Sequence, residues 1–440
     1  MKHKEIIKEL ITFSLPLILS GILQQLYSWA DAFIVGHSGP EGELMLASIG
    51  ATATITMLLV NTMTGFTMGL SILAAQEYGR KNIDTIRQIA KIFLPILGIL
   101  YAVFSVIMIL CLNPVLQIMD TPVEIFNYAY QYLRIILLGV PFLAVYNLFA
   151  ALMRAMGNTK VAFYAVLLSS ILNVILDIVF VILLSLGVAG AATATIISQI
   201  SMTIFIVIYC KIKYPEILKE GQVRKKEVLK KGASFGMPPM IQNSVTSMGS
   251  LVLQNFMNGF GASTVLAITT AYRVDSIMLL PVINLGSAIS SMVARAKGED
   301  NYEKVNNNLW SGLGLMIVIS GVLALAMYLF GAEFVGFFGV TGEALQIGEE
   351  FFRDLSIFYV LFGIATVLRS VLEGTGDITY CSVIGITTLG IRIAFSYILR
   401  PVFAERAIAF AEGITWICLL LFMLMRVIYK HNKIFRKSVR

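Results

Sequence analysis

The sequence predicts an all-α integral membrane protein with twelve transmembrane helices in two pseudo-symmetric six-helix bundles. Composition, the length of the apolar stretches and an internal repeat predict this fold. Of the 440 residues, 58% are hydrophobic and only 13% are charged, whereas soluble domains carry about 25% charged residues. The stretches 92–112 and 309–331 contain no charged residue, and each is long enough to cross a bilayer as a helix.

The same criterion, applied along the whole chain, gives the twelve spans. We expect all of them to be helices, because lipid offers no hydrogen-bond partner to an open strand edge. The predicted spans are 11–36, 45–76, 89–112, 125–153, 161–184, 188–213, 233–260, 264–295, 307–331, 344–372, 380–402 and 406–430.

Lysine and arginine are distributed as expected for a protein with both termini in the cytoplasm. Loops 80–91, 154–160, 211–231 and 295–304 are basic, as is the tail, whereas the intervening loops carry only Arg400 and Arg406. The net charge of +7 therefore reflects membrane topology, and we expect no nucleic-acid partner. The pattern suits a multi-pass protein of the cytoplasmic membrane.

The sequence contains no pattern typical of an enzyme. The four cysteines are scattered, and the three histidines lie near the chain ends or in a loop, so no metal cluster is expected. No nucleophile with a base and no paired His-Glu motif occurs. Lys4, Glu5 and Lys8 precede the first apolar segment, which is longer than a signal-peptide core, so we expect no cleavable signal peptide. We expect neither catalysis nor a cofactor.

An internal repeat divides the chain into two halves. Gly79 precedes Gly298, and Gly157 precedes Gly376, by the same 219 residues. Six spans in each half give both halves the same orientation, related by an axis along the membrane normal, with a V-shaped arrangement and a central cleft. We expect an amino-terminal lobe at 1–210, a cytoplasmic linker at 211–232 and a carboxyl-terminal lobe at 233–440. The linker is either a solvated connector or an interfacial amphipathic helix through Glu216, Leu218, Val223, Val228 and Leu229.

Two aspartates fall inside predicted spans of the first half, where ionisable groups are costly. Asp31 and Asp177 both lie roughly 8–10 Å below the outer surface. Carboxyl, amide, hydroxyl and phenol groups at this depth are typical ligands of a proton or a small hard cation. The alternative is a structural role in hydrogen bonding between helices. The candidate cation-coupling residues are Asp31, Asn173, Asp177, Tyr27, Gln24 and Thr195.

Proline and further charges mark three other positions. Pro16 lies in the same span as Asp31, and a bend there is either static or biased by ion binding. In the second half, Asp275 and Arg392 lie inside predicted spans, and the repeat places Arg392 at the position of Asn173. We expect Asp275 and Arg392 to approach each other, because unpaired charges would be costly there. Such a pair is either structural or a substrate site.

Several segments together resemble the multidrug and toxic compound extrusion (MATE) family. They are Leu15-Pro16-Leu17, Tyr27-Ser28-Trp29-Ala30-Asp31, Ala75-Gln76 to Gly79, Arg154-Ala155-Met156-Gly157-Asn158 and Gly374-Thr375-Gly376-Asp377. The likeness covers essentially the whole chain. One departure is that Thr246 and Ser247 stand where some members carry a glutamate in the seventh span.

The resemblance implies a secondary antiporter that exports cationic, amphipathic small molecules in exchange for inward H⁺ or Na⁺. It implies that Asp31, Asn173 and Asp177 hold the coupling cation. Further expected contacts are membrane lipids, and we expect the chain to act as a monomer. Alternatives are a flippase for a lipid-linked saccharide and an exporter of one specific endogenous solute.

Overall fold

The computed structural model describes residues 3–219, 225–431 and 434, and the described residues form helices without any β-strand. The predicted all-α class is therefore confirmed. Eight continuous helical segments are long and apolar enough to cross a membrane, and two bent helix pairs bring the number to ten. One of the eight, 378–429, contains two helices that pack against each other. The remaining predicted span, the seventh (233–260), corresponds to the 34-residue helix Lys225–Asn258, which is less apolar.

The first bundle follows the first six predicted spans closely. Two short helices, α4 (Leu112–Ile118) and α8 (Pro215–Leu218), follow the third and sixth spans. The long helices are α1 (His3–Gly36), α2 (Gly42–Gly79), α3 (Ile83–Leu110), α5 (Val123–Ala155), α6 (Thr159–Asp177) with the π-helix η1 (Ile178–Leu183), and α7 (Gly187–Lys213).

The second bundle contains two spans that are broken. The pair α10 and α11 bends by 41°, and the pair α13 and α14 bends by 52°. The helices are α9 (Lys225–Asn258), α10 (Ala262–Met278), α11 (Leu280–Gly298), α12 (Tyr302–Gly336), α13 (Glu343–Ser356), α14 (Tyr359–Gly374), α15 (Ile378–Phe403), the 3₁₀ turn η2 (Ala404–Arg406) and α16 (Ala407–Tyr429).

The backbone itself repeats with the period seen in the sequence. Positive φ angles, which are uncommon outside glycine, occur in pairs 219 residues apart. The pairs are Lys81 with Asp300, Asp120 with Gly339, Gly157 with Gly376, and Ser185 with Ala404. The duplication therefore extends to the conformation of the helix-connecting turns.

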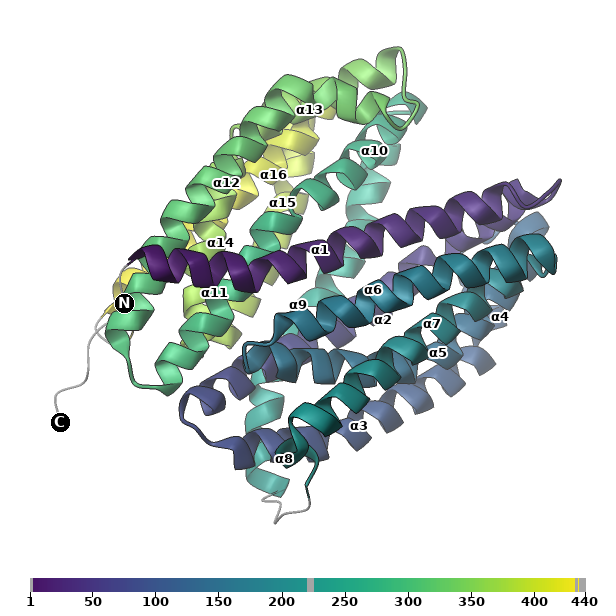
Figure 1. The fold of residues 1–440 in the computed structure, drawn as a ribbon. Coiled ribbons are helices and arrows are strands. Elements are labelled where there is room, and N and C mark those ends of the chain that lie inside the picture. Colours follow the sequence, from purple (N-terminus) through teal and green to yellow (C-terminus); the bar gives the residue numbers. More distant parts are fainter. Residues whose placement is uncertain (1–2, 220–224, 432–433, 435–440) are drawn as a thin grey trace.

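The two bundles meet along the half of α2 that ends at Gly79. There, Thr62 and Ser244 hydroxyls lie 2.8 Å apart, and the Lys231 ammonium lies 2.7 Å from the Glu77 carboxylate. From this contact region the bundles diverge in Figure 1, with the first half of the chain in purple to teal and the second in green to yellow.

Helix α1 belongs to both bundles. Ile6, Leu10 and Leu17 are buried in one apolar cluster with residues of the second bundle. Near the other end, Val35 is buried with Val181 and Ala191 of the first bundle. The helix is continuous from His3 to Gly36, so one unbroken helix connects both apolar cores (Figure 1).

The predicted linker 211–232 is mostly helical where it is described. Helix α9 begins at Lys225, and Val228 is buried in the core of the first bundle. Val228 therefore does not face a lipid interface as an interfacial helix would require. Val223 lies outside the described residues.

Candidate functional site

Asp31 of α1 and Asp177 of α6 are brought together, as the sequence predicts. The side chains lie within hydrogen-bonding reach of each other, because α1 and α6 pack side by side. Asp177 is the last residue of α6, directly before the π-helix η1, and π-turns within helices occur frequently at functional sites. Two ionised carboxylates can only accept hydrogen bonds. A hydrogen bond between them can therefore form only when one of the two carboxyl groups carries a proton.

Asn173 lies one helical turn before Asp177, and both side chains are buried, with 2% and 0% exposed. Among the described residues, and apart from the facing carboxyl group, both oxygens of Asp177, one oxygen of Asp31 and both amide atoms of Asn173 have no hydrogen-bond partner. Buried polar groups are rarely left unpaired. These oxygens thus form a donor set that fits H⁺ or Na⁺.

Two phenol groups lie close to the carboxyl pair. Tyr27 stands one turn before Asp31 and is close enough to interact with it electrostatically. Tyr132 of α5 is buried and interacts electrostatically with Asp31, Asp177 and Tyr27. Tyr132 is not among the site residues that the sequence predicts. It is one of three alternating tyrosines, with Tyr128 and Tyr130, and no pattern shows which of them faces the site.

Gln24 and Thr195 are less closely connected with the pair. The Gln24 side chain is exposed on α1, and the Thr195 hydroxyl donates a hydrogen bond to the Ala191 carbonyl oxygen at 3.0 Å. Their part in cation coupling stays a prediction.

A largely apolar groove lies beside Tyr27, between α1 and α6. Its volume is about 410 Å³, which is within the range of small-molecule pockets. Its lining residues are Leu23, Leu26, Tyr27, Ala30, Leu167, Ser170, Ile171, Val174 and Ile175.

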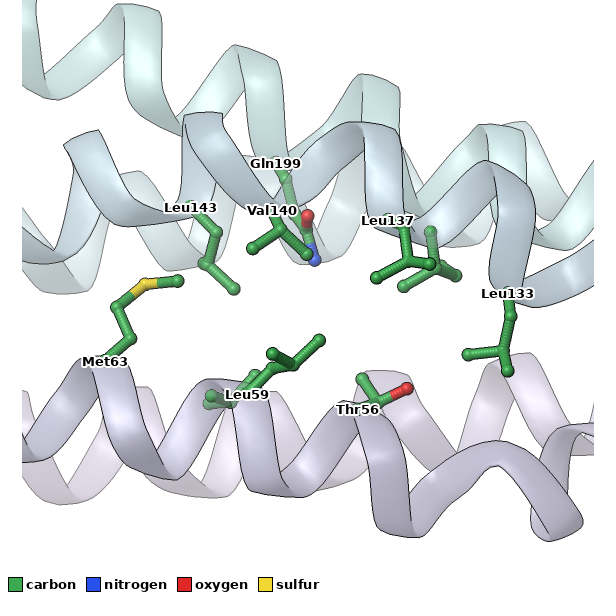
Figure 2. Close-up of a pocket in the computed structure, with 10 residues that line it drawn as sticks. Thr56, Leu59, Met63, Leu133, Leu137, Val140, Leu143 and Gln199 are labelled. Atoms are coloured by element: carbon green, nitrogen blue, oxygen red, sulfur yellow. The ribbon is translucent and has the colours of Figure 1, made fainter. Parts of the chain in front are cut away.

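A second cavity lies between α2 and α5 and is far smaller. Figure 2 shows Leu59 and Met63 facing Leu137 and Val140, with the amide of Gln199 reaching in from α7. Its volume of about 30 Å³ has room for roughly one or two water molecules. This cavity is therefore too small for an organic substrate.

The second bundle holds its own buried polar cluster, but the pairing differs from the prediction. Arg392 forms an ion pair with Glu412 of α16 at 2.8 Å and a hydrogen bond with the Tyr272 hydroxyl at 2.7 Å. Asp275 instead accepts a hydrogen bond from Tyr359. Glu412, not Asp275, is thus the direct ion-pair partner of the guanidinium, and the expected approach of Asp275 to Arg392 stays a prediction. Asp275 remains within electrostatic range of both residues.

Sites for multivalent metal ions usually combine several His, Cys, Asp or Glu side chains. In residues 3–219 and 225–431, no group of three or more His, Cys, Asp or Glu side chains could hold a metal ion. The Asp31–Asp177 pair offers two carboxylates with the Asn173 amide oxygen nearby.

Two six-helix bundles related by a repeat, with buried carboxylates inside the spans, define a polytopic membrane transporter. The MatE family model matches residues 16–179 and 238–398, so this chain belongs to the MatE family. The predicted family and the twelve-helix, two-bundle fold are thereby confirmed.

Curated relatives cover most of the chain at low identity. A probable multidrug resistance protein, YoeA of Bacillus subtilis (strain 168), is 26% identical over 88% of this chain and 85% of its own length. A probable multidrug resistance protein, NorM of Thermotoga maritima, is 26% identical over 85% of this chain and 81% of its own length.

Solved structures show the same fold. The outward-facing conformation of a multidrug resistance MATE family transporter of the MOP superfamily has a TM-score of 0.88, with 22% identity, and covers 100% of this chain and 99% of that chain. A MOP superfamily transporter from Pyrococcus furiosus has a TM-score of 0.87, with 23% identity, and covers 97% of this chain and 98% of that chain.

Proposed function

We propose that this protein is a multidrug efflux antiporter, which exports cationic, amphipathic small molecules in exchange for inward H⁺ or Na⁺. The observation that carries the proposal is the Asp31–Asp177 pair, in which both oxygens of the buried Asp177 and one oxygen of Asp31 have no protein partner beyond the facing carboxyl group. The names of the curated relatives, which are multidrug resistance proteins, support the class of substrate.

The carboxyl pair acts as the ion-binding site. Two facing negative charges inside a membrane protein repel each other, and one monovalent cation between them removes most of that repulsion. Asn173 and the phenols of Tyr27 and Tyr132 supply neutral polar groups around the ion. A ligand shifts a conformational equilibrium only by binding the two states unequally, so the ion favours the state in which α1 and α6 are close together.

Helix α1 transmits this preference. Its segment from Ile6 to Leu17 packs with the second bundle, whereas Asp31 faces α6 of the first bundle. Pro16 lies where the helix is still attached to the second bundle, and its missing N–H makes this turn the easiest place to bend. Ion binding at Asp31 therefore changes the position of α1 relative to the second bundle.

The substrate uses the central cleft in alternation with the ion. The groove beside Tyr27 offers an apolar surface for the body of an amphipathic molecule, and the nearby carboxylates attract its positive charge. Protonation or Na⁺ binding removes that attraction, which favours release of the substrate to the outside. Reopening to the cytoplasm then discharges the ion.

The proposed location and topology follow from the loop charges, and the proposed lobes follow from the repeat. The protein lies in the cytoplasmic membrane with both termini inside, acts as a monomer, and divides at the 211–232 connection into lobes 1–210 and 233–440. Its partners are organic cations and membrane lipids.

The first experiment is ethidium efflux from cells that express the wild type, Asp31→Asn or Asp177→Asn. The matched control is Glu43→Gln, an exposed carboxylate in the first turn of α2. We expect efflux by the wild type and the control, and none by either aspartate variant at equal membrane abundance. Collapsing the proton and sodium gradients separately identifies the ion.

Other outcomes overturn particular parts of the proposal. A wild type that exports no cationic dye contradicts the multidrug substrate class and favours a specific solute or a lipid-linked saccharide. Full efflux by both aspartate variants places the coupling site elsewhere.

A further inference from the structure

The two bent spans of the second bundle meet at one hydrogen bond. Asp275 lies four residues before Leu279, where α10 and α11 join at 41°. Tyr359 is the first residue of α14, directly after the 52° break from α13. The Tyr359 hydroxyl donates to the Asp275 carboxylate. A single contact therefore connects both helix breaks.

The charges around this contact do not balance. Asp275 and Glu412 are carboxylates with only 6% of each residue exposed, and among the described residues Arg392 is the one guanidinium that interacts with them. With all three groups ionised, the cluster carries one net negative charge. An uncompensated charge in a buried environment is costly. One proton makes the cluster neutral.

In the described residues, no cation other than Arg392 interacts with the two acids. Arg273 of α10 is exposed, Arg369 of α14 pairs with Glu373, and Arg400 of α15 donates to the Gly259 carbonyl oxygen. Helix α13 packs on α10, but its Arg353 pairs with Glu349 and its Asp354 accepts two hydrogen bonds from Arg406. The ring of Phe351, also from α13, is what contacts Tyr272.

We propose that Asp275 and Glu412 form a second proton-binding site, separate from Asp31 and Asp177, and that it holds one exchangeable proton. Asp275 receives the proton, because Glu412 is already neutralised by its ion pair with Arg392 at 2.8 Å. The small exposed fraction of both acids admits a proton carried by water and excludes an organic cation.

The proton controls the bend of two helices. A carboxylate accepts a charge-assisted hydrogen bond that is roughly twice as strong as a neutral one. Protonation of Asp275 therefore weakens its bond with Tyr359 and releases the start of α14 from α10. The geometry of both breaks then depends on pH, even when the first bundle cannot bind its ion.

The proton is tested by infrared difference spectroscopy of the full-length protein in nanodiscs, comparing neutral and acidic pH. In Asp31→Asn/Asp177→Asn, we expect the protonated-carboxyl C=O signal to keep one band that belongs to Asp275. Adding Asp275→Asn should abolish it. Glu412→Gln should also abolish it, because Arg392 is then free to neutralise Asp275. Survival of this band after the Asp275 substitution overturns the proposal.

The bend is tested by pulsed electron-spin distance measurements between labels at Leu266 and Ile283, which flank the break and are 51% and 49% exposed. The exposed Cys111 and the partly exposed Cys418 are replaced by serine beforehand. We expect the distance distribution to shift with pH in the Asp31→Asn/Asp177→Asn background. Tyr359→Phe, which keeps the ring and removes the hydroxyl, should hold one distribution at every pH.

The proposal is overturned if the distance does not change with pH while Tyr359 is present. It is also overturned if Tyr359→Phe keeps the same pH response. Both measurements are made without transport and without the first carboxyl pair. Failure here is therefore distinguishable from failure of the antiport mechanism.

Discussion

Gly79 and Gly298 occupy equivalent positions in the two halves, and each packs against the backbone of the other half. A Cβ atom at Gly79 would lie 2.1 Å from the carbonyl oxygen of Arg295, and one at Gly298 would lie 2.0 Å from the carbonyl oxygen of Gln76. Arg295 and Gln76 are themselves 219 residues apart. The pseudo-two-fold axis thus passes between the ends of α2 and α11, which the loop charges assign to the cytoplasm.

Gly79→Ala and Gly298→Ala should each open this contact. Neither backbone oxygen can rotate away, and overpacking of this kind costs about 1–3 kcal/mol. That cost shifts the equilibrium about 5-fold to 150-fold away from the state with closed cytoplasmic ends. Accessibility of engineered cysteines on α2 and α9 to a thiol reagent measures the shift. Gly98→Ala and Gly314→Ala, where a Cβ meets no atom within 4 Å, should leave accessibility unchanged.

Lys231→Met should weaken the same closure by removing a charge pair between the bundles. The Glu77 carboxylate is buried and keeps Arg80 as a partner, while Lys231 is 41% exposed, so the loss is about 1 kcal/mol. Spin-label distances across the cytoplasmic ends should lengthen. Lys230→Met removes an exposed charge beside it, and an equal lengthening in that variant would contradict a specific role for Lys231.

Asp377→Asn should destabilise the protein at neutral pH. Burial would raise the pKa of Asp377, but hydrogen bonds from Arg426 at 2.7 Å and Lys430 at 2.8 Å outweigh it and hold the pKa below its ordinary value. A carboxyl group whose pKa is lowered by folding stabilises the protein above its unfolded pKa of about 4. That contribution is lost as the pH falls through the folded value.

Thermal unfolding in detergent measures this dependence. We expect Tm to fall by an amount equivalent to about 2 kcal/mol at pH 7, and the difference from the wild type to shrink only below about pH 4. Asp300→Asn, on the exposed turn between α11 and α12, serves as control. A difference that grows on acidification would contradict the ion pairing of Asp377.

The sequence predicts the spans because lipid leaves hydropathy and length as the dominant constraints. The predicted span 89–112, for example, corresponds to α3, Ile83–Leu110. The breaks at Leu279 and after Ser356 are invisible to this criterion, since apolar residues continue across both. Hydropathy also does not show which helices pack against each other, so it does not predict that the beginning of α1 is buried in the second bundle.

The candidate sites also depend on helix packing, which hydropathy does not predict. Depth along the helices brings Asp31 and Asp177 into one layer, because each lies near the end of its span. In the second bundle, depth alone does not decide whether Asp275 or Glu412 faces Arg392. That choice depends on the rotation of α10 and α16 about their axes, which only the packing determines.

Cys111 should report the orientation of the protein in intact cells. Its side chain is exposed between α3 and α4, at the end that the loop charges assign to the outside. A membrane-impermeant maleimide should label the wild type in intact cells, and Cys111→Ser should lose most of the label, because Cys210 and Cys381 are buried. Labelling of Cys111 only after permeabilisation would invert the topology.

Pro16→Ala should separate ion binding from transport. Alanine restores the backbone N–H that proline lacks and removes its ring, so the turn becomes stiffer. Asp31 and Asp177 lie about four turns away and should still bind the ion. We therefore expect ethidium efflux to fall at least about tenfold, while proton or sodium binding to the purified protein stays within about twofold.

Ser20→Ala provides the matched control, because Ser20 donates a hydrogen bond to the Pro16 carbonyl oxygen at 2.7 Å without affecting the proline ring. If Ser20→Ala reduces efflux as much as Pro16→Ala, the hydrogen bonding of this turn matters more than its missing N–H. If Pro16→Ala transports normally, α1 moves as a rigid rod. The carboxyl pair then acts by shifting the whole helix against the second bundle.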